Sequence, residues 1–255
     1  MRHWDVESRL ASREVAYPTN VGLALLLLWE FGVPAAGVPA YILPPPSEIV
    51  AAGLAVYPVL IGELLYSLSE FAIGFGATVV SGYLLALLMF YSKPIEMTVY
   101  PYVIVYRSIP IVTLLPMFII WFGFGFNSIV VISYLISFFP MVVNTLSGFK
   151  STDDERVEML KSFSASDREL FWNVYRYSSL PTVFAGLKIS TILAFTGVIV
   201  GEFLIGQEGI GYLIYQYNND FATAKMFAGI FTVSLTQLLF YGGIVATERT
   251  LVTWE

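Results

Sequence analysis

The sequence predicts an all-α membrane protein with about six transmembrane helices, and three observations support this fold class. Of the 255 residues, 57% are hydrophobic and 13% are charged, with a mean hydropathy of +0.74, whereas charged residues make up about 25% of an ordinary soluble domain. Six windows meet or approach the roughly 20 apolar residues that a spanning helix needs. Lysine and arginine are also concentrated in alternate connecting segments, which is typical of multi-pass membrane proteins.

The six windows differ in strength, and the first is the weakest. Glu30 interrupts it and Pro34 closes it, so a cleaved signal peptide ending near Val38-Pro39-Ala40 is an alternative. The preceding segment is long and mixes acidic residues with its arginines, whereas a signal peptide begins with a short positive stretch. We therefore favour a retained span. The predicted spans are residues 17–33, 63–90, 99–121, 128–148, 184–205 and 227–247.

The distribution of lysine and arginine orients the chain, because these residues resist translocation while acidic residues matter little. With a cytoplasmic N-terminus, the outside segments contain only Lys225. The inside segments then contain Arg2, Arg9, Arg13, Lys93, Lys150, Arg156, Lys161, Arg168, Arg176 and Arg249. We therefore expect both termini in the cytoplasm, with residues 1–16 as a cytoplasmic segment and residues 17–255 as a single transmembrane domain.

A polar segment, residues 149–182, interrupts the apolar sequence and holds 11 of the 32 Asp, Glu, Lys and Arg residues. We call it the polar loop. Thr152 with Glu155, and Ser166 with Glu169, fit the capping-box pattern that begins a helix. Apolar residues then recur at spacings of three and four, which predicts two short amphipathic helices: Val157, Leu160 and Phe163, then Leu170, Phe171 and Val174. We expect this loop to face the cytoplasm and to bind another protein. The alternative is that its two helices lie on the lipid surface.

The third predicted span contains an arginine and two prolines. Arg107 at a helix centre costs about 2.5–3.5 kcal/mol, which the apolar residues around it can offset. Pro110 and Pro116 predict a kink or a break in this span. In the second span, Gly74, Thr78 and Gly82 either mark the close approach of another helix or reflect the ordinary glycine content of membrane helices.

The residue types needed for several kinds of chemistry are missing. The chain has no cysteine, no phosphate-binding loop and no paired histidine motif, and His3 reads as a solvated residue. We therefore assign no catalytic residue and no metal ligand. The net charge of −6 without a basic cluster argues against nucleic acid. Arg107 and Glu202 are the costly ionisable residues within spans, and they either mark a pathway or form a structural ion pair between the third and fifth spans.

Several motifs occur in a recognisable order along about 200 residues. They are Leu43-Pro-Pro-Pro-Ser47, Arg107-Ser-Ile-Pro110, Leu115-Pro116, Trp121-Phe-Gly123-Phe-Gly125, and Glu202 followed by Gly209-Ile-Gly211-Tyr-Leu-Ile. With them, residues 43–254 resemble the integral membrane permease subunits of ABC-type importers, in the branch that handles nitrate, sulfonates, taurine, riboflavin and pyrimidine precursors.

The cytoplasmic EAA motif of that family is only partly kept. The family reads E-A-A, three residues, G, nine residues, then I-x-L-P. Here Glu158-Met159-Leu160 stands for E-A-A, Ser164 for the glycine, Val174 for the isoleucine, and Arg176-Tyr177 for L-P. A serine fits a tight turn if its φ angle stays negative, so we expect a local defect in the turn.

The resemblance implies that the polar loop forms coupling helices that dock into a groove on a separate cytoplasmic ATPase subunit. The residues implied in this contact are Val157, Glu158, Leu160, Lys161, Phe163, Ser164 and Ala165. Candidates for the translocation pathway are Arg107, Glu202, Tyr212 and Gln216, the last two because an outside segment rich in tyrosine and amide groups suits a planar or polar solute.

The resemblance also implies the partners and the location. ATP and magnesium would bind the ATPase subunit, and this chain would bind no cofactor. A second permease copy or a paralogue would complete the pathway, and an extracytoplasmic binding protein would deliver the small-molecule solute. The chain would be a multi-pass protein in contact with lipid in the cell membrane of a prokaryote. An ion-coupled secondary transporter is the first alternative, although no internal repeat is visible; a membrane enzyme is the second and would need clustered acidic or histidine residues.

Overall fold

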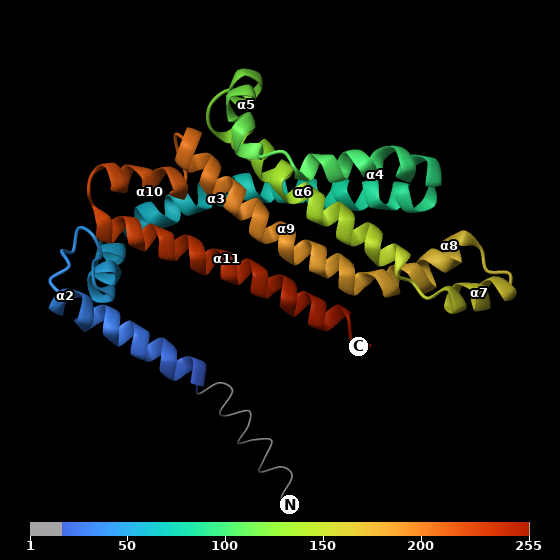
Figure 1. Ribbon diagram of the computed structural model, residues 1–255, viewed down its shortest axis with the longest axis horizontal. Coiled ribbons are helices and arrows are strands. Elements are labelled where there is room, and N and C mark those ends of the chain that lie inside the picture. The colour runs from blue at the N-terminus through green and yellow to red at the C-terminus, as the bar shows by residue number, and fades with distance from the viewer. Residues whose placement is uncertain (1–16, 255) are drawn as a thin grey trace, which may run out of the picture. The chain divides into compact units, whose positions relative to one another are not determined.

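A computed structural model describes residues 17–254, and every regular element in this range is a helix (Figure 1). Residues 1–16, the predicted cytoplasmic segment, and Glu255 lie outside the described residues. Residues 17–27 are helical. They are followed by η1 (Leu28–Gly32), α2 (Val33–Ala35), α3 (Pro46–Tyr91), α4 (Lys93–Arg107), η2 (Ile111–Leu114), α5 (Leu115–Phe122), α6 (Phe126–Lys150), α7 (Asp154–Ser162), α8 (Asp167–Leu170), η3 (Phe171–Tyr175), α9 (Arg176–Ile205), α10 (Ile210–Asn219) and α11 (Thr223–Leu251).

Four helical stretches in the described residues are long and apolar enough to cross a membrane: α3, α6, the continuous stretch Asp167–Ile205, and α11. A fifth candidate is the pair formed by α4 and residues Ile111–Phe122, which are bent by 90° relative to each other. The predicted break in the third span is therefore confirmed. Pro110 lies at the bend, where it lacks an N–H group and disfavours helical geometry in the residue before it.

The chain forms two compact units, and the first comprises the residues up to Leu60 together with Ile214–Phe231. In this unit Glu30 accepts hydrogen bonds from the backbone N–H and the hydroxyl of Ser47, at 3.0 and 2.6 Å. The indole N–H of Trp29 donates to the Pro44 carbonyl at 3.1 Å. Glu30, which weakens the first predicted span, thus satisfies a free N–H group at the start of α3.

The helix α3 begins at Pro46, 17 residues before the predicted start of the second span at Glu63. The prolines at 44–46 read as a turn in the sequence, but proline is well suited to the first position of a helix because its N–H group would be unpaired there anyway. Residues 46–62, expected in an external loop, are therefore helical.

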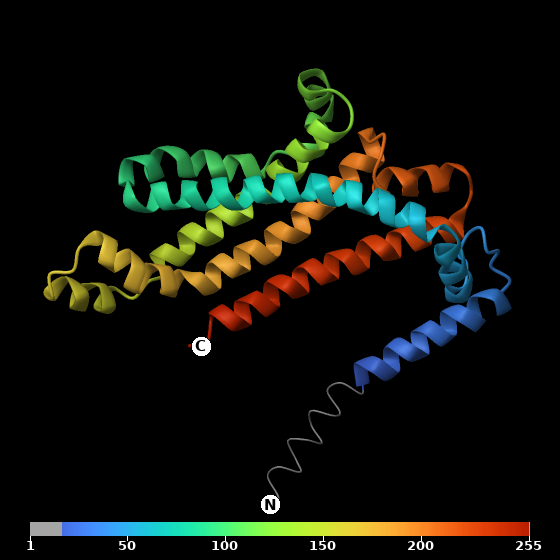
Figure 2. The same ribbon diagram turned by 180° about the vertical axis from the view of Figure 1, so that it is seen from behind.

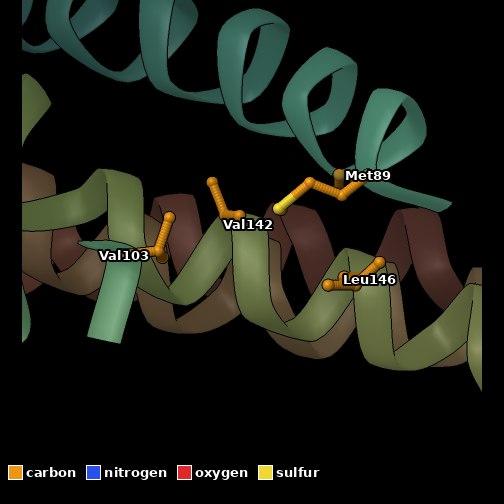
Figure 3. Close-up of a cluster of buried hydrophobic side chains, with 5 residues drawn as sticks. Met89, Val103, Val142 and Leu146 are labelled. Atoms are coloured by element: carbon orange, nitrogen blue, oxygen red, sulfur yellow. The ribbon is translucent and has the colours of Figure 1, made fainter. Parts of the chain in front are cut away.

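The second unit, Ile61–Leu213 with the residues from Thr232, has a core in which α3, α4 and α6 meet. Figure 3 shows Met89 of α3 beside Val142 of α6, with Val103 of α4 and Leu146 of α6 in the same cluster. Met89 and Val142 are fully buried. Between membrane helices such side chains stabilise the contact by close packing rather than by removal from water.

Helices α6 and α9 run side by side in both views, in contact along their length (Figures 1 and 2). Small residues allow this approach: a Cβ added at Gly197 would lie 3.1 Å from the Ser133 Cα, and one at Gly148 3.0 Å from the Ser179 carbonyl oxygen. The alternative left open for the second span is also settled in favour of close approach. A Cβ at Gly74 would lie 2.8 Å from Ser133 Oγ, and Thr78 hydrogen bonds to Ser137 at 2.7 Å.

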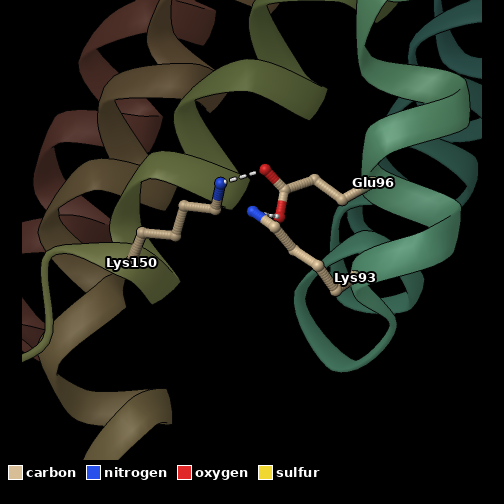
Figure 4. Close-up of polar contacts among 3 residues, drawn as sticks. All are labelled: Lys93, Glu96 and Lys150. Carbon is tan, nitrogen blue, oxygen red and sulfur yellow. Dashed lines mark hydrogen bonds and ion pairs between the residues drawn. The ribbon is translucent and has the colours of Figure 1, made fainter.

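Two sets of charged side chains join helices of the second unit. Lys188 of α9 pairs with Glu248 of α11 at 2.9 Å. Lys150, at the end of α6, and Lys93 both reach Glu96 of α4, at 2.5 and 3.2 Å (Figure 4). Lys188, a charged residue within the fifth predicted span, thus has a carboxylate partner on a neighbouring helix.

Candidate functional site

The polar loop contains two short helices, and its first helix begins differently from the prediction. The side chain of Asp153, not Thr152, caps α7 by accepting the backbone N–H of Glu155 at 2.9 Å. Thr152 is 8% exposed, and its hydroxyl has no hydrogen-bond partner among the described residues. The predicted box of Thr152 and Glu155 is therefore wrong by one residue, because Asp153 is an equally good cap and is closer to the helix.

The second predicted cap is confirmed. Ser166 and Glu169 form a complete capping box at the start of α8. The backbone N–H of Ser166 donates to Glu169 at 2.8 Å, and this bond holds the pKa of the Glu169 carboxyl below its ordinary value. Helix α8 then continues through η3 into α9 without a break in the chain of helical residues.

Ser164 lies in the turn between the two short helices and has a positive φ of 61°. The N–H of Ser164 donates to Lys161, and that of Ala165 donates to Leu160, which together form the Schellman arrangement that ends many helices. The expectation that serine would fit the turn with a negative φ is therefore wrong. The turn keeps the left-handed geometry for which glycine is the usual residue.

The apolar residues of the polar loop divide into a buried and an exposed set. Val157 is 6% exposed and packs with Leu170 and Val174, and Leu160 and Ala165 pack against this cluster. Phe163 and Met159 are 77% and 56% exposed. The single exposed stripe of Val157, Leu160 and Phe163 predicted from spacing is therefore wrong, because the interior of the loop takes up the first two. Glu158, Lys161 and Ser164 are exposed around Phe163 and Met159.

Arg107 lies at the end of α4, where the chain bends, and its guanidinium is 5.4 Å from the centre of the Phe139 ring. A cavity of about 450 Å³ adjoins it, lined mainly by apolar side chains of α6 and α9 together with Tyr106 and Asn144. No ion pair joins Arg107 to Glu202 in the described part of the chain, where the ion pairs involve Glu96, Asp153 and Glu248. The hypothesis of a structural pair between these two residues is therefore wrong.

Glu202 is fully buried near the end of α9 and holds the chain segment that follows it. It accepts hydrogen bonds from the Ser67 hydroxyl at 2.5 Å and from the backbone N–H of Gly211 at 2.7 Å. A Cβ at Gly211 would lie 2.6 Å from the Ile199 carbonyl oxygen, so only glycine fits. The G-x-G of the Gly209 motif thus folds directly over Glu202.

The remaining pathway candidates lie on α10. Tyr212 is half-buried in its first turn and Gln216 is exposed. Gln216 belongs to the first compact unit and Tyr212 to the second. The structure therefore brings Glu202 and Tyr212 into one unit with Arg107.

Sequence reasoning missed the partners of Glu202 on α3. Glu63, Ser67 and Glu70 recur at spacings of four and three, which places them on one helix face. Glu63 accepts the backbone N–H of Gly209 at 2.6 Å, and the Ser67 hydroxyl accepts that of Ile210 at 2.9 Å. Polar residues at helical spacing within an apolar window were the available signal.

The sequence of the chain matches a family model and several named proteins. The family model described as "Binding-protein-dependent transport system inner membrane component" matches residues 78–251. The chain is 36% identical to the formylaminopyrimidine transport permease protein ThiX of Halalkalibacterium halodurans, over 96% of this chain and 98% of that protein. It is 32% identical to the riboflavin transport system permease protein RibX of Chloroflexus aurantiacus, over 91% and 88%. The taurine transport system permease protein TauC of Escherichia coli is 26% identical over 96% and 91%.

Solved structures show the same fold. The inward-facing MetNI methionine ABC transporter matches with a TM-score of 0.67 and 16% identity, over 77% of this chain and 98% of that one. An amino acid ABC transporter solved with histidines matches with a TM-score of 0.63 and 18% identity, over 77% and 96%.

Proposed function

This chain belongs to the binding-protein-dependent transport system inner membrane component family, and from that premise we propose that its polar loop couples solute import to a separate ATPase. It is a multi-pass permease subunit of an ABC importer in the inner membrane. The family match and the named relatives favour this function over an ion-coupled secondary transporter. The single observation that carries the coupling proposal is the pair of exposed apolar side chains, Met159 and Phe163, at the tip of the polar loop.

The construction of the polar loop supports the proposal. A helix that docks into a groove presents apolar anchors flanked by charges, and Phe163 is flanked by Glu158 and Lys161 on α7. Behind them the buried cluster of Val157, Leu170 and Val174 joins α7 to the helical stretch that leads into α9. A push on α7 would thus reach α9 through packed side chains.

The complete transporter needs components that this chain does not supply. We assign ATP and magnesium to the partner ATPase and no cofactor to this chain. The system is completed by a second permease copy or paralogue and by an extracytoplasmic binding protein. We propose that the permease has six spans, with both termini in the cytoplasm. Arg107, Glu202, Tyr212 and Gln216 remain the candidates for the pathway. The ATPase must bind two conformations of the permease with different affinities, because only such a difference can shift the equilibrium between them.

The test compares exposed positions of the polar loop with a matched position elsewhere. Phe163→Asp and Glu158→Arg should abolish ATPase co-purification and uptake while membrane insertion is normal, because both side chains are exposed and their loss leaves the buried cluster intact. Phe124→Asp is the control, since Phe124 is also exposed, at 63%, but lies between α5 and α6. Normal ATPase binding by Phe163→Asp and Glu158→Arg would contradict the coupling role.

For the substrate we propose a planar nitrogen heterocycle. Two relatives above 30% identity are named for formylaminopyrimidine and riboflavin, and the residues that line the cavity beside Arg107 include the aromatic Tyr106 and Phe139. Uptake by the full transporter should compete with formylaminopyrimidine or riboflavin and not with taurine. Competition by taurine alone would contradict this substrate class.

A further inference from the structure

A second acidic side chain lies against the Glu202 site and has no assigned role. Glu70 of α3 is fully buried, and neither of its carboxyl oxygens receives a hydrogen bond from a donor group of the described protein. Glu70 follows Ser67 by three residues on α3, so the two lie on the same helix face. Because Ser67 donates to the Glu202 carboxyl of α9, Glu70 and Glu202 belong to the same buried polar cluster. Two carboxyl groups can hydrogen bond only if one of them carries a proton, since an ionised carboxylate has no donor.

The hydrogen-bond donors are distributed unequally between the two carboxyls. Glu202 already accepts two hydrogen bonds, from Ser67 and from the backbone of Gly211, an arrangement that stabilises a negative charge. Glu70 has no such donors. We therefore infer that Glu70 and Glu202 form a proton-binding site, in which Glu70 is a neutral acid and donates its proton to the Glu202 carboxylate.

The surroundings offer no other way to neutralise the pair. The titratable groups that face it are Glu63 and Tyr66 from α3 and Glu208 from the segment between α9 and α10, and none is cationic. Residues 17–254 contain no group of three or more acidic or metal-binding side chains arranged to hold a metal ion. Two unpaired charges at full burial would be very unfavourable, so the proton supplies the missing countercharge.

Infrared spectroscopy of the purified full-length protein in nanodiscs tests the site directly. The wild type should show the carbonyl stretch of a protonated carboxylic acid at neutral pH, shifted in D₂O. Glu70→Gln should lose this band, and the variant should fold because the amide is neutral and has nearly the same size as the protonated acid. Glu48→Gln is the control, because Glu48 is an exposed glutamate of the same helix, and its spectrum should match the wild type.

Thermal unfolding gives a second readout. Above about pH 5, where the glutamates of an unfolded chain are ionised, unfolding would release the Glu70 proton. The unfolding equilibrium constant should therefore rise about tenfold per pH unit in the wild type relative to Glu70→Gln. An acid band that is absent from the wild type, or unchanged in Glu70→Gln, would overturn the proposal. So would stabilisation by sodium without an acid band, which would assign the site to a cation.

Discussion

Ser164 is the residue at which the chain departs furthest from its family's motif, yet the turn keeps the geometry that the motif specifies. Its φ of 61° and the bonds from Ser164 and Ala165 to the end of α7 are those of a glycine-type helix ending. A left-handed conformation costs a residue with a side chain about 1–2 kcal/mol. The backbone bonds of the turn and the packing of Ala165 against the buried cluster of Val157, Leu170 and Val174 offset that cost.

Substitution at Ser164 should therefore follow backbone preference. We expect Ser164→Gly to raise the thermal stability slightly, by up to about 1 kcal/mol, because the relief of strain exceeds the added entropy of the unfolded chain. Ser164→Val should lower it by about 1–2 kcal/mol. Ser162→Val, at the last residue of α7, is the matched control and should change little. Equal stability of Val and Gly at 164 would show that the turn is not left-handed.

Arg107 is the second residue with a specific expectation. Replacing it with alanine should reduce uptake at least about tenfold, or roughly 1.4 kcal/mol, because the cation beside Phe139 and the cavity is lost. Arg107→Lys should retain part of the activity, and ATPase association should be unchanged in both. Full uptake by Arg107→Ala would remove Arg107 from the pathway.

At the scale of helices, glycines determine where α3, α6 and α9 approach one another. The sequence identified Gly74, Thr78 and Gly82 as a possible contact face, and the break at Pro110, because both depend on local residue types. It did not identify Glu30 and Asp153 as capping groups or the earlier start of α3. Those features depend on which acceptor reaches a free N–H group, and several nearby residues could have served.

The contact between α6 and α9 gives a stability prediction. Gly197→Leu should destabilise the protein by about 1–3 kcal/mol, since its Cβ would meet the backbone of α6 at Ser133. Gly62→Leu on α3 is the control, because nothing lies within 4 Å of a Cβ there. Thermal unfolding in detergent compares the two. A loss of the same size in both variants would mean that the close contact at Gly197 does not set the cost.

For the whole molecule, composition and motif order were enough to predict the all-helical membrane fold and the family, because the apolar segments and the motifs are distributed over most of the chain. The exposure of the site residues could not be predicted. The spacing of Val157 and Phe163 predicts that both lie on the same helix face, so it does not distinguish a buried residue from an exposed one. The packing of α8 and η3 against α7 buries Val157 and leaves Phe163 exposed.

The orientation of the chain is testable because the sequence contains no cysteine. A single cysteine at Lys161 should react with a membrane-impermeant maleimide only in inverted vesicles, since the polar loop is predicted to be cytoplasmic. A cysteine at Asn219, in the predicted outside segment, should react in intact cells. The reverse pattern would invert the topology and, with it, the coupling proposal.

The start of α10 resembles an anion-binding site but is occupied by the protein itself. The N–H groups of Gly209, Ile210 and Gly211 would attract an anion, but Glu63, Ser67 and Glu202 of the protein already occupy all three. None of these three N–H groups is left to bind an anion from outside the protein. The protein's own side chains thus close this helix end to an external anion.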